Sequence, residues 1–170
     1  MIRKLALAAV AAGFLATPAL AAGTITVETS KNCSFTISLR PDLAPKHVAQ
    51  ITKLASSGFY DGVVFHRVID GFMAQTGDPT GTGMGGSQEP DLPAEFSAEP
   101  YKRGTVGMAR SQNPDSGNSQ FFIMFADGDF LNGQYTVWGH VDEQGMACVD
   151  QIAKGEPPAN PDKMTKVTVQ

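Results

Sequence analysis

Alternation of apolar and polar residues indicates short β-strands along most of the chain. Residues 24–28 (TITVE) and 35–39 (FTISL) alternate in this way, and the turn-like segment 30–32 between them predicts an opening hairpin. Further strands are predicted at 105–109, 120–125, 136–141 and 165–169. Short strands joined by long connections favour an all-β barrel or sandwich over a βαβ fold.

Helical spacing is found in two segments. Residues 45–57 (PKHVAQITKLASS) place their apolar side chains on one face, namely Val48, Ile51, Leu54 and Ala55. His47 falls on the polar side of this helix, so we expect it to be solvated. Residues 145–154 (GMACVDQIAK) repeat the spacing with Met146, Val149 and Ile152 and predict a second helix.

The segment 63–78 (VVFHRVIDGFMAQTGD) predicts a second strand-turn-strand unit. Its β-branched and aromatic residues are typical of strands, and Asp70-Gly71 is a hairpin turn signal. Arg67 is a cation within an otherwise apolar strand, and such a residue must be paired or face a group that accepts its hydrogen bonds. An ion pair with a neighbour such as Asp70 is the simplest structural explanation.

Residues 79–93 (PTGTGMGGSQEPDLP) are rich in Gly and Pro and predict a long surface loop. A phosphate-binding role is disfavoured, because neither a G-x-G-x-x-G run after a strand nor a GK[ST] motif is present. Glycines here more simply allow the backbone to approach a ligand or another loop. Two further turn-rich segments, 110–119 and 127–133, separate the later strands.

The N-terminal residues have the layout of a secretory signal peptide. Arg3 and Lys4 precede an apolar stretch at 5–15, and an A-x-A pattern ends at Ala21. The apolar stretch is too short for a membrane span. We therefore expect cleavage after Ala21, a single domain over residues 22–170, and a bacterial periplasmic or secreted location.

Charge and cysteine content narrow the classes of partner. Removing residues 1–21 leaves 11 basic and 17 acidic residues, a net charge of −6, which argues against nucleic acid and anionic membranes as partners. Cys33 and Cys148 are too few for a disulfide framework or a metal site. They could form one bridge in an oxidising compartment, but the sequence does not place their Cα atoms within the required distance, so it leaves open whether the two are joined.

The sequence contains no strong nucleophilic, acid–base or metal-binding pattern. None of the three histidines, His47, His66 and His140, neighbours a Gly-flanked Ser. The carboxylates that could form pairs lie in turn-rich segments, where they serve solubility and turn formation: Glu95, Glu99, Asp127 and Asp129. We therefore expect no cofactor and no metal. Arg67 with the apolar and amide residues after it suits a reaction that needs shape, desolvation and one hydrogen-bond donor.

Four ordered segments, FHRVIDGFMAQTGD, the run ending in GMGG, GTVGMAR and SQFFI, resemble the signature segments of the cyclophilin family of peptidyl-prolyl cis/trans isomerases. The resemblance extends from about residue 24 to residue 169. It implies a mainly β fold, an eight-stranded antiparallel closed β-barrel capped by two α-helices, with the binding groove on its outer surface. It also implies isomerisation of X-Pro bonds in unfolded or flexible polypeptides, without a cofactor.

Carried over by position, the resemblance implies a catalytic set of Arg67, Phe72 and Gln75. The implied substrate-binding residues are His66, Met73, Gly83, Ala109, Arg110, Ser111, Gln120, Phe122, Phe130, Leu131 and Tyr135. Arg67 is the expected donor to the prolyl nitrogen, and the proline ring is expected between Phe72, Met73, Phe122 and Leu131. Phe121 and Phe122 must face opposite sides of their strand, and Phe122 is the one expected in the groove. By the same alternation His66 must point away from Arg67.

Several positions depart from the common family pattern. Phe130 stands where cyclosporin-sensitive members carry Trp, which implies weak cyclosporin binding, and Tyr135 replaces a frequent His, as in bacterial members. Arg110, Ser111 and Met84 leave the preference for residues before proline open. We expect a monomer that assists the folding of exported proteins. A module that holds Pro-containing segments without turnover is the alternative, while a ligand-storing barrel is disfavoured because large residues should fill its interior.

Overall fold

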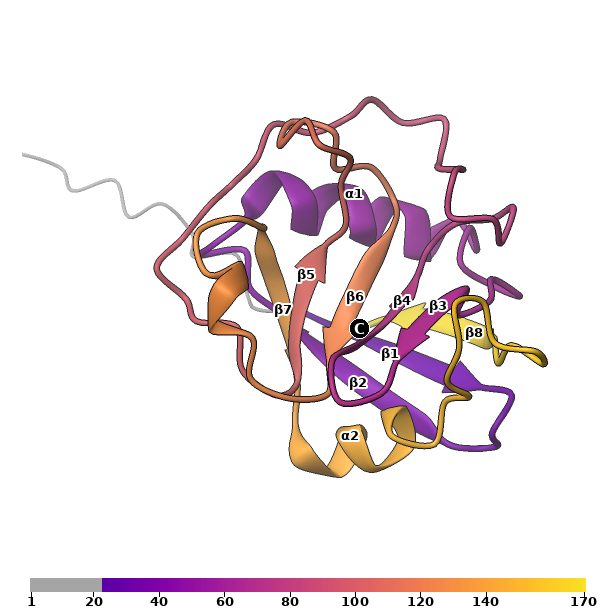
Figure 1. Cartoon of the computed structure of the whole chain (residues 1–170). Helices are drawn as coiled ribbons and strands as arrows, with labels where there is room; N and C mark the ends of the chain where they lie inside the picture. The colour runs from indigo at the N-terminus through magenta and orange to yellow at the C-terminus, as the bar shows by residue number, and fades with distance from the viewer. Residues whose placement is uncertain (1–22) are drawn as a thin grey trace, which may run out of the picture.

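The computed structural model describes residues 23–170, so the predicted signal peptide at 1–21 lies outside the described residues. One eight-stranded antiparallel sheet has the strand order β3-β4-β6-β5-β7-β2-β1-β8 (Figure 1). The strands are β1 (Thr24–Thr29), β2 (Ser34–Leu39), β3 (Arg67–Ile69), β4 (Met73–Thr76), β5 (Thr105–Met108), β6 (Phe121–Met124), β7 (Val137–Val141) and β8 (Met164–Val169). The predicted strands are thus confirmed, with bounds shifted by one or two residues.

The sheet curls until its two end strands, β3 and β8, approach each other. An isolated bridge joins Val64 to Lys163, and the Phe65 N–H donates to the Asp162 carbonyl at 2.8 Å. Residues 63–65 therefore contribute a single bridge rather than the continuous strand that their sequence predicts. The predicted barrel-like, mainly β fold is confirmed, with its seam made by this bridge rather than by a ladder between β3 and β8.

Two α-helices, α1 (Pro45–Ser56) and α2 (Glu143–Val149), lie at opposite ends of the sheet (Figure 1). Helix α2 is shorter than the 145–154 pattern predicts. It starts earlier because the Asp142 side chain accepts a hydrogen bond from Gly145 N at 2.7 Å and caps the first turn. Within residues 23–170, no helix is both long and apolar enough to cross a membrane.

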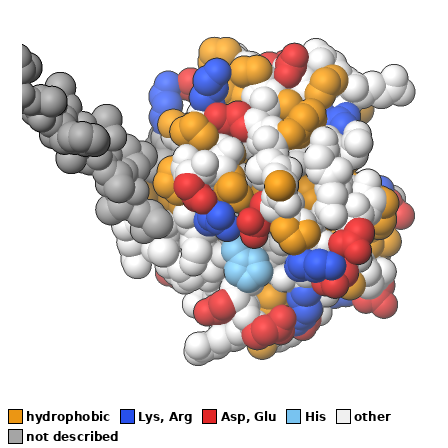
Figure 2. Space-filling view, turned by 90° about the vertical axis from the view of Figure 1, so that its left-hand side faces the viewer, with side chains coloured by type: hydrophobic (Ala, Val, Ile, Leu, Met, Phe, Trp, Pro, Cys, Tyr) orange, Lys and Arg blue, Asp and Glu red, His pale blue; other side chains and the backbone are white. Residues whose placement is uncertain are grey.

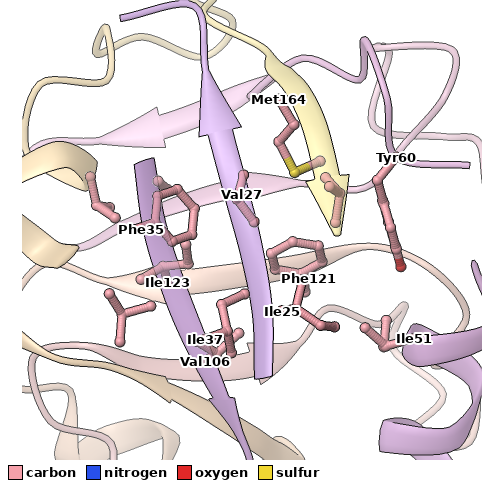
Figure 3. Close-up of a cluster of buried hydrophobic side chains, with 14 of the residues drawn as sticks. Ile25, Val27, Phe35, Ile37, Ile51, Tyr60, Val106, Phe121, Ile123 and Met164 are labelled. Atoms are coloured by element: carbon pink, nitrogen blue, oxygen red, sulfur yellow. The ribbon is translucent and has the colours of Figure 1, made fainter. Parts of the chain in front are cut away.

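Large side chains from both sides of the curled sheet fill its interior. Figure 3 shows Ile25, Val27, Phe35, Ile37 and Phe121 pointing toward one another from β1, β2 and β6. All of these are buried, and Tyr60 and Ile51 of the α1 side close the same cluster. The strand alternation is therefore explained by burial of one face. A filled interior confirms that the barrel does not store a ligand inside.

The expectation of a solvated His47 is wrong. Its side chain is 1% exposed, and its Nδ1 lies 2.6 Å from Glu95 Oε2. The Glu95 carboxylate also accepts hydrogen bonds from the backbone N–H groups of Lys46 and His47 in the first turn of α1. The loop 79–95 thus folds back over the helix, and Glu95 caps it from a distance, where a negative charge is favourable. Helical periodicity identifies the face of α1 that packs on the sheet, but it could not show that a loop buries another side of the helix.

The buried histidines predict a pH dependence of stability. Burial lowers the pKa of His47, opposed by the Glu95 carboxylate, and burial likewise lowers the pKa of His66. Because the pKa of each histidine is lower in the folded state, the unfolded chain binds protons at a higher pH than the folded chain does. The free energy of unfolding is therefore largest above the ordinary histidine pKa and decreases as the pH falls through that value. Urea unfolding at about pH 7.5 and about pH 5.5 should therefore show a lower free energy of unfolding in acid.

The His47→Gln variant should show a weaker pH dependence than the wild type over the same interval. His140, which is exposed, supplies the matched control as His140→Gln. An unchanged pH dependence in the His47 variant would contradict the assignment.

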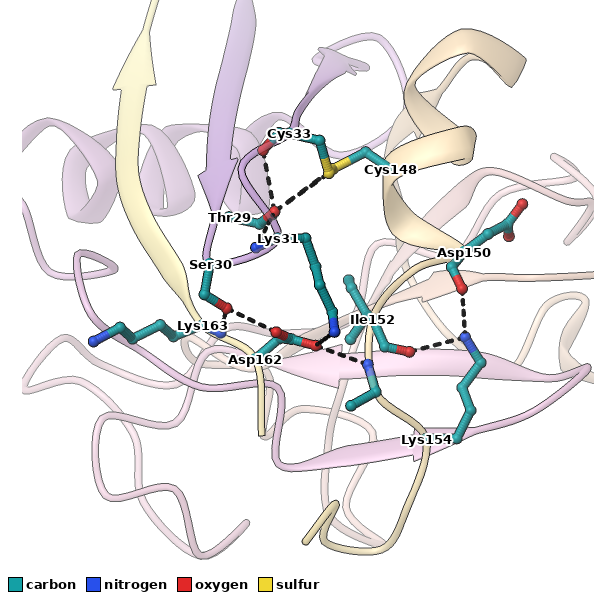
Figure 4. Close-up of polar contacts among 11 residues, drawn as sticks. Thr29, Ser30, Lys31, Cys33, Cys148, Asp150, Ile152, Lys154, Asp162 and Lys163 are labelled. Carbon is teal, nitrogen blue, oxygen red and sulfur yellow. Dashed lines mark hydrogen bonds and ion pairs between the residues drawn. A yellow bond between two sulfur atoms is a disulfide. The ribbon is translucent and has the colours of Figure 1, made fainter. Parts of the chain in front are cut away.

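The sequence left the pairing of the cysteines open, and in the structure Cys33 and Cys148 form a disulfide with a Cα–Cα distance of 5.8 Å. The bond joins the β1–β2 turn to α2 (Figure 4). Beside it, Asp162 accepts hydrogen bonds from Ser30 Oγ and from Ala153 N and pairs with Lys31. Only the docking of α2 on β2 brings the two cysteines together, and no local pattern encodes that docking.

Charged side chains of both signs are interspersed on the face shown in Figure 2, with small groups of hydrophobic side chains between them. This face therefore carries no broad basic surface of the kind that nucleic-acid binding requires. The distribution agrees with the negative formal charge of the chain.

Candidate active site

The candidate site begins with a row of paired residues across four neighbouring strands. Arg67 of β3 pairs with Gln75 of β4, Gln75 pairs with Phe122 of β6, and Phe122 pairs with Gly107 of β5. Residues next to each of these in the chain belong to the core, namely Val68, Ala74, Ile123 and Val106. Because strand residues alternate between faces, the row lies on the outer face of the sheet.

A pocket of about 120 Å³ opens on this row, and apolar side chains form its floor. It is lined by Arg67, Phe72, Met73, Gln75, Ala109, Arg110, Phe122, Leu131 and Tyr135. Its floor is firm, because Met73, Phe122 and Leu131 belong to a second buried cluster in which Tyr101 stacks on Phe122 at 5.7 Å. A Cβ at Gly107 would lie 2.5 Å from the Phe122 ring, so glycine is needed there for the ring to lie flat on the strand.

Arg67 is held from two sides at the edge of this pocket. Its Nε donates to Glu156 Oε1 at 2.9 Å, and its Nη1 donates to Gln75 Oε1 at 3.3 Å. The expected alternative of an ion pair with Asp70 is therefore not what the structure contains. The side chain remains 44% exposed, so its remaining N–H groups are accessible from the pocket.

Amide side chains connect Arg67 to the Gly-rich loop. Gln75 Nε2 donates to Gln120 Oε1 at 3.0 Å, and Gln120 Nε2 donates in turn to the carbonyls of Gly83 at 3.0 Å and Gly85 at 2.8 Å. This unbroken chain of hydrogen bonds orients both glutamines. The orientation of the Arg67 guanidinium therefore depends on the position of the loop, through Gln120 and Gln75.

A second, wider pocket of about 600 Å³ lies beside the first and shares Gln75, Ala109 and Arg110 with it. Its other lining residues are Gly83, Met84, Gly85, Gly86, Ser87, Asp91, Ser111, Ser116, Asn118 and Gln120. The Asn118 side chain accepts from Ser87 N at 2.8 Å and donates to Asp91 at 2.9 Å, which ties the two bordering loops together. The site is therefore an extended groove with a small end floored by apolar side chains and a wider end bordered by two loops.

Asp78 organises the loop that lines the wider pocket. The side chain is fully buried, and its carboxylate accepts hydrogen bonds from Thr80, from Gly83 N at 2.6 Å and from Gly85 N at 3.1 Å. Burial by itself would raise the pKa of Asp78, but hydrogen bonds from Thr80, Gly85 and Gly83 outweigh it and lower the pKa to about 2. The ionised Asp78 carboxylate thus holds the loop together by accepting hydrogen bonds from several of its backbone N–H groups.

Replacing Asp78 with asparagine is expected to loosen the Gly-rich loop. An amide presents N–H groups to backbone N–H donors, which should destabilise the loop by about 1–3 kcal/mol and lower kcat/KM several-fold through Gln120. Hydrogen exchange at the amides of Gly83 and Gly85 should become faster. Asp115→Asn, which affects an exposed carboxylate in another loop, is the control.

Acid should loosen the same loop in the wild type. Because the folded pKa of Asp78 is lowered to about 2, the contribution is present at pH values above the ordinary carboxyl range and is lost as the pH falls through 2. Loop exchange rates that remain unchanged in both the variant and acid would contradict this role for Asp78.

The other predicted site residues lie around the rim or beneath it. The Arg110 guanidinium lies 4.4 Å from the centre of the Tyr135 ring, which itself meets Phe122 edge-on. Phe130 is 71% exposed, packs against Phe72 at 5.5 Å and lines neither pocket. His66 is buried, and a Cβ at Gly83 would lie 3.5 Å from its ring, so it supports the loop from below.

Several residues that shape the groove were not among the predicted site residues. Asp78 had a usable signal, since an Asp followed by Thr and Gly residues often accepts several backbone N–H groups. Asp91 and Asn118 lie in polar segments without any distinguishing pattern. Glu156 had no signal at all, because its contact with Arg67 joins residues 89 positions apart in the sequence.

Comparison with known proteins identifies the family. Residues 24–169 match the family described as Cyclophilin type peptidyl-prolyl cis-trans isomerase/CLD. A probable peptidyl-prolyl cis-trans isomerase of Brucella suis is 60% identical over 156 residues, covering 82% of this chain and 79% of the relative. A peptidyl-prolyl cis-trans isomerase of Helicobacter pylori is 40% identical over 134 residues, covering 77% of this chain and 80% of the relative.

Solved structures agree with the sequence relatives. A cyclophilin from Hirschia baltica has a TM-score of 0.77 and 30% identity, covering 85% of this chain and 73% of its own. A cyclophilin type isomerase from Cryptosporidium parvum has a TM-score of 0.79 and 26% identity, covering 88% and 98%. The chain therefore belongs to the cyclophilin-type peptidyl-prolyl cis-trans isomerases, enzymes that interconvert the cis and trans forms of X-Pro peptide bonds.

Proposed function

We propose that Arg67 catalyses the isomerisation by donating a hydrogen bond to the prolyl nitrogen of a substrate clamped in the smaller pocket. The observation that carries this proposal is the row of Arg67, Gln75 and Phe122 across one face of the sheet. This row places the Arg67 guanidinium, a cationic hydrogen-bond donor, directly beside the apolar side chains proposed to bind the proline ring. No nucleophile or metal is needed for such a reaction, because no covalent bond is made or broken.

The chemistry follows from the peptide bond itself. Rotation about an amide has a barrier of about 18–20 kcal/mol because resonance must be lost, and unaided X-Pro bonds exchange over tens to hundreds of seconds. As the bond twists, the prolyl nitrogen becomes pyramidal and gains a lone pair. A donor aimed at this lone pair stabilises the twisted state more than either planar state, which is the requirement for catalysis.

Arg67 suits this role because a guanidinium is a planar cation with several N–H donors in a fixed arrangement. Gln75 holds it at Nη1, while Met73, Phe122 and Leu131 offer a buried surface for the proline ring. Burial of a group of this size contributes roughly 1.5–3 kcal/mol to binding. The ring is thereby held while the acyl side of the bond rotates.

The wider pocket is proposed to receive the residues before proline. A related Cryptosporidium parvum isomerase was crystallised in the presence of the dipeptide Ala-Pro, which supports a proline-directed site in this fold. Ala109 and Arg110 border both ends of the groove, Ser111 borders the wider end, and Met84 is 91% exposed at the rim of that end. Since Phe130, which packs against Phe72 beside the smaller pocket, offers no N–H donor, cyclosporin is expected to bind weakly.

Mechanism and turnover can be tested together. NMR exchange on a short X-Pro peptide at a small molar fraction of enzyme separates catalysis from holding, because a module that merely holds the peptide accelerates nothing at that ratio. Variants of Arg67 then test the donor. An unchanged rate in those variants would exclude the mechanism.

The substrates are proposed to be exported proteins in the periplasm, acted on by a monomer. The arrangement of Arg3, Lys4 and the A-x-A pattern ending at Ala21 supports this location. Mass spectrometry of protein recovered from the periplasmic fraction of a bacterial host should find a chain that begins at residue 22. A chain recovered only from the cytoplasm with its first residues intact would contradict the proposal.

A further inference from the structure

Glu156 lies beside Arg67 because the backbone puts it there. Val68 and Gly155 exchange both of their backbone hydrogen bonds, each at 2.8 Å, in an antiparallel bridge. In antiparallel pairing the residue before Val68 stands opposite the residue after Gly155. Arg67 and Glu156 are therefore a direct cross-strand pair, on the opposite side of β3 from Gln75.

The bridge that places Glu156 depends on a glycine. A Cβ at Gly155 would lie 2.6 Å from Pro158 Cα and 2.8 Å from Pro158 N, so a larger residue would displace this segment. The segment is also anchored at its start, where Ala153 N donates to Asp162 at 2.9 Å (Figure 4). The position of the Glu156 backbone is thus set by its neighbours rather than by its own side chain.

Two side chains accept hydrogen bonds from different nitrogens of the Arg67 guanidinium. Glu156 takes Nε and Gln75 takes one hydrogen bond from Nη1. Within residues 23–170, Nη2 makes no hydrogen bond to the protein and stays available. Within the same described residues, the Glu156 carboxylate accepts one hydrogen bond, the one from Arg67. Its contact therefore serves the orientation of Arg67 and no other group.

We propose that Glu156 is a positioning residue for Arg67 and that its charge makes this end of the groove disfavour acidic substrate side chains. The inference rests on the proposed role of Arg67 as the donor. A guanidinium held at two edges presents its free N–H groups in one direction, which reduces the ordering needed in the twisted state. The ion pair is half exposed, at 44% for Arg67 and 53% for Glu156, so its contribution to overall stability is small.

The charge has a separate consequence for substrate choice. An acidic residue next to proline would approach the Glu156 carboxylate and would also compete with it for Arg67. Repulsion between such partly exposed charges is modest and weakens as salt is added. Neutral and basic neighbours of proline are therefore preferred, most strongly at low ionic strength.

The positioning role is tested by Glu156→Ala and Glu156→Gln. With a neutral X-Pro peptide, the alanine variant should lower kcat by about three- to fivefold with little change in KM, the size expected for one exposed ion pair. The glutamine variant keeps an acceptor for Nε and should restore most of the loss. The Nε–Hε resonance of Arg67 should shift in both variants.

Glu143→Ala is the matched control, because that exposed carboxylate also pairs with an arginine Nε, that of Arg103, at 3.1 Å and outside the groove. It should leave kcat and the Arg67 resonance unchanged. An alanine variant of Glu156 with wild-type kcat, or with an unshifted Arg67 resonance, would overturn the positioning role.

The charge effect is tested with peptide pairs that carry Glu or Gln immediately before or after proline. The wild type should show kcat/KM about two- to fivefold lower for the Glu peptide of at least one pair at low salt, and the difference should shrink in about 0.5 M salt. Glu156→Gln should remove the difference while keeping the acceptor. Discrimination that persists in this variant, or that is absent from the wild type, would overturn this part of the proposal.

A double-mutant cycle separates this inference from the mechanism. If Glu156→Ala alone lowers kcat, Arg67→Ala lowers it far more, and Glu156→Ala has no further effect on the residual rate of the Arg67 variant, both roles stand. If Arg67→Ala lowers kcat strongly while Glu156→Ala alone has no effect, the positioning role fails and the donor role remains. If Arg67→Ala leaves the rate unchanged, the donor role itself fails.

Discussion

Replacing Arg67 with alanine is expected to lower kcat/KM for a short X-Pro peptide by about a hundred- to a thousandfold, the usual effect of removing one transition-state donor. The substitution removes the only cationic group of the smaller pocket besides Arg110, which is engaged by the Gln134 carbonyl and the Tyr135 ring. NMR exchange spectroscopy on the peptide measures the effect. Because the interaction is made in the twisted state, the loss should fall on kcat more than on KM.

Folding should be little affected by the same change, since Arg67 is a partly exposed side chain with one ion pair. Arg67→Lys should retain the charge but lose the planar fork, and is expected to recover only part of the rate. Arg40→Ala is the matched control, because Arg40 is similarly exposed and ion-paired with Asp42 and Glu99 and lines neither pocket. A rate loss of equal size in the Arg40 variant would point to a general defect and contradict the donor role.

Removing the disulfide is expected to have the largest effect on stability. Cys33 and Cys148 are separated by 115 residues in the sequence, and closing a loop of that size restricts the unfolded chain strongly. The double variant Cys33→Ala with Cys148→Ala should lower the free energy of unfolding by about 3–5 kcal/mol. Urea unfolding of the wild type with and without reductant, and of the double variant, provides the measurement.

Reductant should have no effect on the double variant, which serves as the control for the reagent. The folded double variant should keep its kcat/KM, because the residues that line the two pockets come from neither the β1–β2 turn nor α2. Equal unfolding midpoints for the oxidised and reduced wild type would contradict a stabilising role for the bond.

Much of the candidate groove could be predicted from local sequence. The strand signals around Arg67 and around Phe122 were sufficient to place these residues on strands, and alternation correctly separated Phe121, which lies in the core, from Phe122, which lines the pocket. Gly83 and Gln120 were both expected among the substrate-binding residues, and both line the wider pocket. Their direct hydrogen bond, from Gln120 Nε2 to the Gly83 carbonyl, exists only because the Gly-rich loop folds around Asp78.

Predictions failed where one element is covered by a distant one. His47 was expected in solvent because a helical pattern records only one buried face, whereas residue Glu95 from a long loop covers the other side. The pairing of the cysteines was left open for the same reason. Their pairing depends on where α2 docks, which is decided by shape and packing rather than by local residue preferences.

By itself, the sequence determined the strands, both helices, the family and the row that carries Arg67, because alternation, helical spacing and motif order are local properties of the chain. Tertiary structure alone decided the disulfide, the Glu95 cap of α1 and the contact between Arg67 and Glu156. Each of these joins residues far apart in the sequence. Their approach depends on strand register and on loop closure, which a local pattern does not record.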